Sequence, residues 1–529
     1  MKPLFILATV FAVLFVSTAL AVATGETWPS LRFSFTIRRS AMQVHGYSDF
    51  SVVANPIVSE HDTGSRVLYD TFATFTEDST LYDYTLVDGR SYVSQVSLDD
   101  SSSNPSVECE EDTALLSINS IVGALVEAVP VSSITSKRGG AIECSGGDTF
   151  KVSVDGIDFG VCFTGRTGFT MYGNDMDIEV EYVKTQETIP APKGVPANCD
   201  SVASPSSVTS IGRSLLTGES MSPQDARRLK SASLTFDFVL GNDDDSCSCK
   251  STPRPCIFVH GLGISKEEPE NLDVFPTNYW GNLTDHAPCC SSIKYAMLNT
   301  VNNSWTDDEQ QQKVCDRVLA VSKTSQGTMV SDTIIITHSM GGLLVAGAIA
   351  TGKCSLDKSV SWVGLSAPMR GSMASNYFQD SCMNETNFIV EDLAAKTGFC
   401  PADDGIISLA YQGDDYSTPE LDAAYAAAQK VYRREVTALM CSNGFSGLRS
   451  KRQWWYWTLG TVVPHKSFKN DGMVEFHSCA GGFPPAHFGN SYKNAFYVTK
   501  LNHADTAFRN GDSLLNKAKM PLKWFQCLL

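Results

Sequence analysis

The sequence contains few basic residues, and this scarcity excludes one class of partner. It carries 41 lysines and arginines against 58 aspartates and glutamates, which gives a formal net charge of −17 at pH 7. Nucleic acids and anionic lipid headgroups recruit proteins through positive surfaces, and no basic run in the chain supplies such a surface. We therefore predict that the protein binds no nucleic acid.

Motifs for nucleotide and metal binding are also missing. No glycine-rich phosphate loop or dinucleotide fingerprint follows any apolar run of the chain. Cys247 and Cys249 lie beside three aspartates, but the paired C-x-x-C knuckles of a zinc site are absent, so a metal site is the weaker interpretation of this cluster. We therefore expect neither a cofactor nor a metal.

Cysteine, by contrast, is plentiful. Of the 16 cysteines, four lie between Cys109 and Cys199 and twelve lie between Cys247 and Cys527. Because both counts are even, we expect disulfides inside two separate units, although the spacing does not assign the connectivity.

The first 23 residues have the pattern of a secretory signal peptide. A weakly positive start precedes an apolar run from Leu4 to Val22, and small residues follow near position 23. An uncleaved membrane anchor is the alternative, since this run is long enough to span a bilayer, but nothing downstream resembles a transmembrane helix. We predict a secreted, extracellular glycoprotein. Its glycosylation sequons are at Asn282, Asn302 and Asn384.

Residues 25–200 are typical of an antiparallel β domain, because apolar and polar residues alternate along several short runs. Turn-forming pairs separate such runs at Asp88-Gly89, Asp155-Gly156 and Gly173-Asn174. One apolar stretch, Ala114 to Val129, has helical spacing, and we expect it to plug or cover the sheet. A curved sheet of this kind can hold an apolar ligand, but a packing or folding module is the preferred interpretation.

Residues 201–232 are rich in serine, proline and glycine and are predicted to form an interdomain linker. A processing protease could cut this linker at Arg227-Arg228, although such pairs often stay uncut. From residue 233 onward, short apolar runs alternate with helical segments, which predicts an α/β domain whose parallel sheet is buried on both faces. The expected strands are Leu234–Leu240, Cys256–Val259, Thr333–Ile336 and Val360–Leu365.

The run from Thr333 to Gly342 places Ser339 between a buried strand and the start of a helix. This is the arrangement of a nucleophile elbow, a turn so tight that small residues such as Gly341 must lie near it. The pentapeptide from His338 to Gly342 resembles the elbow of lipases in the α/β-hydrolase superfamily. Thr337 departs from that pattern, which has glycine at this position, so a β-branched side chain must fit close to the turn.

A serine hydroxyl attacks only when a base removes its proton and an acid orients that base. We assign His503 as the base and Asp471 as the acid, because both follow the nucleophile in the order serine, acid, histidine. Their segments resemble the corresponding motifs of secreted bacterial triacylglycerol lipases. Asn-Asp-Gly also suits an ordinary surface turn. The competing acids are Asp403, Asp404, Asp414 and Asp415.

The attack also requires N–H donors for the oxyanion that develops on the substrate. Met340, directly after the nucleophile, is the first expected donor. The segment Cys256–Gly263 resembles the His-Gly-Leu oxyanion segment of lipases, and this resemblance implies that Leu262 supplies the second N–H.

The resemblance covers residues 233–529 at most and implies an α/β-hydrolase fold, with a mostly parallel sheet, helices on both faces and a helical cap. The cap is expected at about residues 373–469, where Leu421–Cys441 has the clearest helical spacing. The aromatic run Trp454–Trp457 could line an acyl pocket or face a lipid interface, although simple burial is preferred.

The bacterial lipases that these motifs resemble often carry a structural calcium near the catalytic histidine, and Asp505 matches the position of one ligand. Arg509 places a fixed positive charge one turn further on, which opposes a dication, so no metal is included in the prediction. Hydrolysis by serine, histidine and aspartate needs no cofactor.

Together these features predict a secreted serine ester hydrolase, a lipase or carboxylesterase that forms an acyl-enzyme on Ser339. Its partner is a lipid or other ester, with peripheral contact to a lipid interface as an option. A GPI-anchor or phospholipid deacylase, or an acyltransferase, on the same fold is the near alternative, because this chemistry does not select the alcohol. A non-catalytic secreted lipid-binding protein, with an elbow spoiled by Thr337, is the alternative of another class. The natural ester and the oligomeric state stay open.

Overall fold

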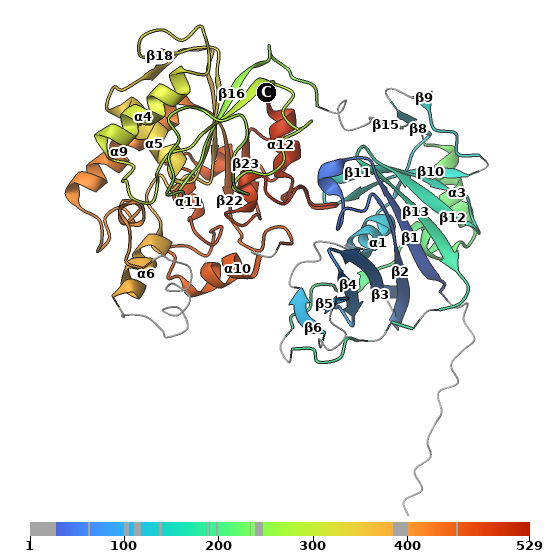
Figure 1. Ribbon diagram of the computed structural model, residues 1–529. Helices are drawn as coiled ribbons and strands as arrows, with labels where there is room; N and C mark the ends of the chain where they lie inside the picture. The colour runs from blue at the N-terminus through green and yellow to red at the C-terminus, as the bar shows by residue number, and fades with distance from the viewer. Residues whose placement is uncertain are drawn as a thin grey trace, which may run out of the picture.

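The computed structural model contains two large sheets of different kind, each with its own hydrophobic core (Figure 1). We call the part of the chain up to residue 238 the first domain and the part from residue 247 the second domain. The predicted signal peptide at 1–23 and the sequon at Asn384 lie outside the described residues. The structure describes residues 28–61, 64–99, 105–110, 118–136, 140–145, 147–186, 188–189, 191–196, 199–232, 234–238, 247–383, 400–450 and 453–529.

The first domain is built on an antiparallel sheet, as its alternating pattern predicted. Within the described residues the strand order is β6-β5-β4-β3-β2-β1-β13-β12-β11-β10-β7, and β14 pairs with β3. The three predicted turns are confirmed, since they connect β4 to β5, β10 to β11 and β12 to β13. The strands are β1 (Ser30–Ile37), β2 (Asp49–His61), β3 (Gly64–Glu77), β4 (Thr80–Val87), β5 (Arg90–Ser97), β6 (Ser106–Glu110), β7 (Val129–Pro130), β10 (Asp148–Val154), β11 (Ile157–Phe163), β12 (Gly168–Tyr172), β13 (Met176–Val183) and β14 (Ser206–Ser207).

A helix covers this sheet at the place where the sequence predicted one. Helix α1 (Ile118–Val126) contacts β3, β10 and the second helix, α2 (Ser210–Thr217). Ile121, Val122 and Leu125 of α1 are fully buried in one core with the apolar side chains of β1 and β13. This face of the sheet is therefore filled by protein side chains, which favours the packing role of the first domain.

The predicted linker at 201–232 is wrong over much of its length, because these residues fold onto the first domain. Strand β14 extends the sheet, and Ile211, Leu215 and Leu216 of α2 are buried in its core. Three of the small or polar residues in this segment cap helices. Thr209 caps the start of α2, Gly218 ends it with φ 74°, and Ser222 caps α3 (Pro223–Lys230).

The first predicted strand of the α/β domain also belongs elsewhere. Its described part, β15 (Thr235–Phe238), pairs in parallel with β8 (Ser133–Ser136), which in turn pairs with β9 (Gly140–Ala141). Phe236 packs there against Val131 and Ile134. An apolar run of this length predicts a strand but not its neighbour, so the boundary expected at residue 233 moves past β15.

The second domain contains a parallel sheet with the order β17-β16-β19-β21-β22-β23 among the described strands. Ile257 and Ile335 face a layer of helices α4, α5 and α9, whereas Phe258 and Ile336 face a layer that includes α12. Both faces are thus buried, as expected. The elements are β16 (Arg254–Val259), β17 (Cys290–Ala296), α4 (Asp308–Leu319), β19 (Ile334–His338), α5 (Met340–Ala350), β21 (Ser361–Leu365), α9 (Pro419–Glu435), β22 (Val436–Ser442), β23 (Phe496–Thr499) and α12 (Pro521–Leu528).

The expected cap at 373–469 is too long, because its middle belongs to the central sheet. The helix predicted at Leu421–Cys441 ends at Glu435, and the chain continues directly as β22, which pairs with β21 and β23. Helix α9 is therefore a crossover helix, and it packs against α5.

The elements that remain as a cap are α6 (Met373–Cys382), α8 (Asp404–Ile407) and α10 (Gln453–Val462). They share a small apolar cluster that includes Tyr377, Ile406 and Leu459. In the aromatic run on α10, Trp455 is half-buried against this cluster, whereas Trp457 is exposed, so the expected burial holds for only part of the run.

Eight disulfides join all 16 cysteines, and each one lies within a single domain, which confirms the expected division. This density is typical of proteins from oxidising compartments. Cys247 and Cys249, considered as metal ligands, bind Cys527 and Cys289 instead. Among the described helices, none has both the length and the apolar character needed to cross a bilayer.

The two domains contact each other in part through the segment that follows His503 (Figure 1). Leu514, Leu515 and Met520 lie in the core of the first domain. Arg39 of the first domain forms a buried ion pair with Asp512 of the second, at 3.1 Å between nitrogen and oxygen.

Candidate active site

Ser339 occupies the turn between β19 and α5, as predicted, and has the strained backbone of an elbow. Its φ of 55° and ψ of −132° are rare for a residue with a side chain. Two glycines make room for the turn. A Cβ on Gly341 would come within 2.5 Å of the Val259 carbonyl oxygen, and one on Gly261 would come within 2.4 Å of Ser339 Cβ.

Thr337 is accommodated although the lipase pattern has glycine there. The side chain is fully buried, and its Oγ1 accepts a hydrogen bond of 2.9 Å from Trp362 Nε1 on the adjacent strand β21. The hydroxyl that burial would otherwise leave unpaired is therefore satisfied. The nucleophile's N–H binds Leu365 O at 2.9 Å, so the turn keeps a defined position despite the threonine.

The structure brings the three residues predicted as nucleophile, base and acid together. His503 Nε2 lies 2.9 Å from Ser339 Oγ, and His503 Nδ1 lies 2.8 Å from Asp471 Oδ2. The exposed fractions are 6% for Ser339, 8% for His503 and 1% for Asp471. A base within hydrogen-bond reach of a hydroxyl, itself held by a carboxylate, is the arrangement that activates a serine for attack.

Asp471 is held ready in its ionised form. Burial by itself disfavours the charged carboxylate, but His503 and the N–H groups of Met473 and Val474 outweigh burial and lower the pKa of Asp471 below its usual value. These two N–H groups bind Oδ1 at 3.0 and 2.7 Å, which leaves Oδ2 for the imidazole. The backbone N–H of His503 also donates a hydrogen bond to the backbone carbonyl oxygen of Asp471, at 2.9 Å.

The competing acids have other partners. Asp403 caps α8 through the N–H of Ile406 at 2.9 Å, and Asp414 pairs with Lys466 at 2.6 Å. Asp404 begins α8, and the N–H of Asp415 binds the Asp414 carboxylate. Among the described residues, Asp471 is thus the acid that the geometry offers to His503.

The two expected oxyanion donors lie beside the nucleophile. Met340 starts α5, and Leu262 follows Gly261, which is packed against Ser339. Neither the Leu262 N–H nor the Met340 N–H donates a hydrogen bond to an acceptor within the described part of the chain. N–H groups without a protein acceptor are what an oxyanion hole requires.

One peptide unit of this loop is clamped by residues whose role the sequence did not predict. The Gly261 carbonyl accepts hydrogen bonds from His260 Nδ1 at 2.7 Å and from Thr300 Oγ1 at 2.9 Å. In a trans peptide the Leu262 N–H must point away from this carbonyl, so the clamp sets the direction of the donor. Leu298 N–H binds His260 Nε2, and burial lowers the pKa of His260 to about 4, so this imidazole is neutral.

Asp505, which resembles a calcium ligand by position, does not fit that role. Both carboxylate oxygens accept N–H donors, from Leu448 and from Asn510, each at 2.5 Å. Burial raises the pKa of Asp505 to about 6. Arg509, cited against the metal, binds the Tyr279 carbonyl instead.

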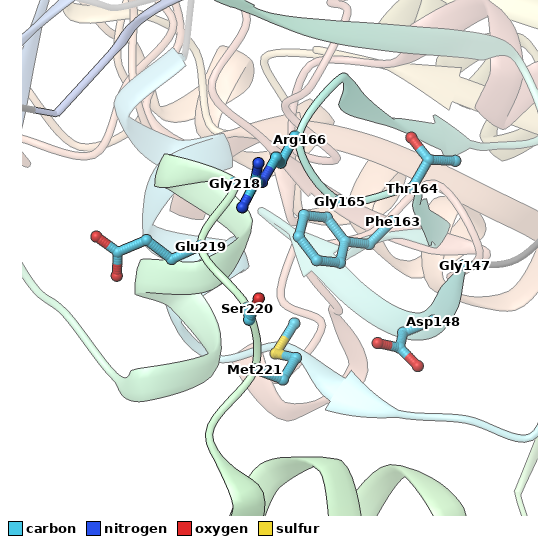
Figure 2. A pocket seen from close by; sticks show the side chains of 10 residues that line it. All are labelled: Gly147, Asp148, Phe163, Thr164, Gly165, Arg166, Gly218, Glu219, Ser220 and Met221. Carbon is cyan, nitrogen blue, oxygen red and sulfur yellow. The ribbon is translucent and has the colours of Figure 1, made fainter.

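A shallow hollow of about 260 Å³ lies in the first domain, between the turn that follows β11 and the connection between α2 and α3 (Figure 2). Figure 2 shows Phe163, Arg166 and Met221 around it. All of its lining residues fall between 147 and 221, outside the sheet that carries Ser339. It is therefore not the substrate pocket of the triad.

No protein-family model and no curated protein matches the sequence. Solved structures that it resembles include prolyl oligopeptidase B from Galerina marginata in its apo form, with 10% identity over 87% of this chain and 62% of the other, at a TM-score of 0.19. A second belongs to a comparison of two prolyl endopeptidases, with 9% identity over 86% and 61% of the two chains and a TM-score of 0.20. The chain thus spans about three fifths of these structures.

Proposed function

We propose that the protein is a secreted serine hydrolase that cleaves carboxylic esters, with lipid esters as its substrates. The observation that carries the proposal is the continuous contact from Asp471 through His503 to Ser339, at 2.8 and 2.9 Å. His503 takes the proton of the Ser339 hydroxyl as Oγ attacks the ester carbonyl carbon and forms a tetrahedral intermediate. Asp471 stabilises the imidazolium that forms on His503. The N–H groups of Leu262 and Met340 receive the oxyanion.

The collapse of this tetrahedral intermediate releases the alcohol, which takes the proton from His503, and leaves an acyl-enzyme on Ser339. Water then attacks with His503 again as the base and releases the acid. The surroundings of the oxyanion loop support an apolar acyl group. Leu262, Trp455 and Met473 are only partly buried, and all three pack against the apolar cluster of the cap.

Two observations oppose the non-catalytic alternative. Thr337 does not spoil the elbow, because its hydroxyl is paired with Trp362 and Ser339 lies in reach of its base. The face of the first sheet that was considered for a lipid is filled by α1 and α2. A deacylase or acyltransferase shares all the geometry described, so only products distinguish these from a lipase.

The test is labelling and turnover of the full-length secreted protein. A fluorophosphonate probe should label the unsubstituted chain and not Ser339→Ala, and p-nitrophenyl esters should be hydrolysed only by the former. Ser366→Ala is a matched control, since Ser366 is also buried and has φ 47°, but lies at the end of β21. Equal labelling of Ser339→Ala and the unsubstituted chain would refute the proposal.

A series of p-nitrophenyl esters of rising acyl length shows which acyl length the protein prefers. The matching anilides show whether it cleaves ester bonds in preference to amide bonds. Glycerides, phospholipids and GPI lipids, analysed for free acid and for acyl transfer to added alcohols, then separate lipase, deacylase and acyltransferase. Preference for short acyl chains over long ones would contradict the lipid assignment while leaving the serine hydrolase intact.

A further inference from the structure

The residue before the nucleophile, His338, takes no part in the triad but is almost fully buried beside it. Its exposed fraction is 2%, and its ring centroid lies 4.7 Å from that of His503. Burial lowers the pKa of His338 well below its usual range, and the neighbouring His503 adds to this effect. The imidazole of His338 is therefore neutral, with one nitrogen that donates and one that accepts.

The partners of His338 identify which nitrogen carries the hydrogen. Nε2 lies 2.9 Å from the carbonyl oxygen of His503, which can only accept, so Nε2–H is the donor. Nδ1 must then accept, and its partner at 2.6 Å is the hydroxyl of Tyr279. Thr506 Oγ1 lies 3.1 Å from the same Nε2, and because its own hydrogen is donated to the His503 carbonyl at 2.9 Å, it can only accept from His338.

Tyr279 extends this series of hydrogen bonds to the oxyanion loop, the segment after β16 that contains Gly261 and Leu262. Its hydroxyl oxygen accepts the N–H of Gly261 at 2.6 Å, so one donor and one acceptor of the phenol are both used. Arg509, six residues after the base, binds the Tyr279 carbonyl and lies over its ring, with the guanidinium carbon 4.8 Å from the ring centroid. Both the ring and the hydroxyl of Tyr279 are thus fixed.

We propose that Tyr279 and His338 are positioning residues, whose hydrogen-bond chain from the Gly261 N–H to the His503 carbonyl holds the oxyanion donor of Leu262 in register with the base. This rests on the proposed serine hydrolase function. The chain passes through the residue before Ser339, so oxyanion loop, nucleophile and base are joined by three short contacts. These segments otherwise come from sequence positions far apart, near 261, 339 and 503.

The physical reason for such a chain is the small tolerance of the attack. The base must reach the hydroxyl while the oxyanion donors reach the carbonyl oxygen, and a displacement of about 1 Å in such a site can cost about 100-fold in rate. A neutral His338 also serves better than a charged one, because an imidazolium there would repel the imidazolium that forms on His503.

The experiment compares three variants of the full-length protein. Tyr279→Phe removes both contacts of the hydroxyl. His338→Gln keeps a donor at the Nε2 position, toward His503, but loses the acceptor for Tyr279. His338→Asn keeps an acceptor at the Nδ1 position, toward Tyr279, but cannot reach His503. Active sites are counted with the fluorophosphonate probe, and kcat per counted site, KM and the thermal midpoint are measured with one soluble ester.

Each variant should lower kcat per active site by about 10- to 100-fold, with KM within about twofold of the unsubstituted value. Tyr279→Phe should cost less in the His338→Gln background than alone, because the two changes break one shared contact. Tyr497→Phe is the matched control. Its buried hydroxyl likewise accepts one N–H, from Met520 at 3.1 Å, and donates to one carbonyl, that of Lys517 at 2.5 Å. It should lower the thermal midpoint but not kcat per site.

Values of kcat per site within about twofold of the unsubstituted protein in the His338 variants would overturn the proposal, even if Tyr279→Phe failed to fold. An equal loss of kcat in Tyr497→Phe would overturn it as well, because general destabilisation would then explain the effect. If the unsubstituted chain is not labelled by the probe at all, the serine hydrolase function itself fails, and the positioning role fails with it.

Discussion

Trp362 and Thr337 lie diagonally across adjacent parallel strands, since Trp362 is opposite Ile335 and Thr337 is opposite Gly364, and the indole N–H of Trp362 donates a hydrogen bond to the hydroxyl of Thr337. Both side chains are fully buried. A threonine two residues before the nucleophile therefore brings a polar group into the core, and the neighbouring strand provides the donor that satisfies it. The motif and its partner have to change together, because either one alone leaves a buried polar group without its hydrogen bond.

The first prediction follows from this pairing. Trp362→Phe and Thr337→Ala should each lower the free energy of unfolding by about 1–3 kcal/mol, since each leaves one partner unpaired. The double variant should lose less than the sum of the two single losses, because it removes both polar groups. Denaturant unfolding of the four proteins measures the difference. Additive losses would show that the hydrogen bond contributes nothing specific.

The meeting of Ser339, Asp471 and His503 could be predicted because each of them stands in a short motif. Each is identified by the residues next to it, and the order along the chain then suggests the proposed roles. Tyr279 and Thr300 stand in no such motif. Their contribution depends on which segment lies next to the loop after β16, and this neighbourhood is set by the strand order of the sheet, which the spacing along the chain does not encode.

The boundaries were predicted less well, for a local reason. Helix α9 passes into β22 at Val436 without glycine or proline, so its end carries no stop signal and the apolar spacing runs on. The opposite error arose at 201–232, where Thr209, Gly218 and Ser222 look like linker residues but cap two helices. Helix caps and flexible linkers use the same residue types, so composition alone does not separate them.

The second prediction concerns pH. Burial lowers the pKa of His260 from 6.5 to about 4. Below about pH 6.5 the unfolded chain takes up a proton at this residue and the folded chain does not, so the free energy of unfolding falls as the pH is lowered toward 4, by roughly 3 kcal/mol at most. His260→Asn, which keeps a donor toward the Gly261 carbonyl, lacks this dependence.

The variant should thus be less stable than the unsubstituted chain at about pH 7, because the Leu298 N–H loses its acceptor, and the gap should close as the pH falls to about 4.5. Thermal midpoints of the two proteins across this range measure the gap. A gap that stays constant would mean that His260 is not held neutral in the folded state.

The third prediction concerns the connection between the domains. Arg227 and Arg228 lie exposed on α3, whose start is capped by Ser222, and a protease must unwind this helix to cut there. A specific protease site inserted after Ser231 tests what holds the halves together once the chain is open. Each disulfide lies within one half, so only non-covalent contacts remain after cleavage.

We expect the cleaved protein to elute as one species in size-exclusion chromatography and to separate in denaturant without a reducing agent. Leu515 is buried in the core of the first domain, and the buried pair Arg39–Asp512 lies three residues away. Breaking a buried ion pair costs about 3–5 kcal/mol, because the remaining charge stays unpaired in a dry contact. The cleaved Arg39→Gln and Leu515→Asp variants should therefore dissociate more readily than the unsubstituted halves, which the pairing of β15 with β8 and the Lys523–Asp175 ion pair also join. If the unsubstituted halves separate on their own, the contact between them is too weak to hold the first domain on the second after cleavage. If they stay together, the position of the segment after His503 depends on the first domain even in the cleaved chain.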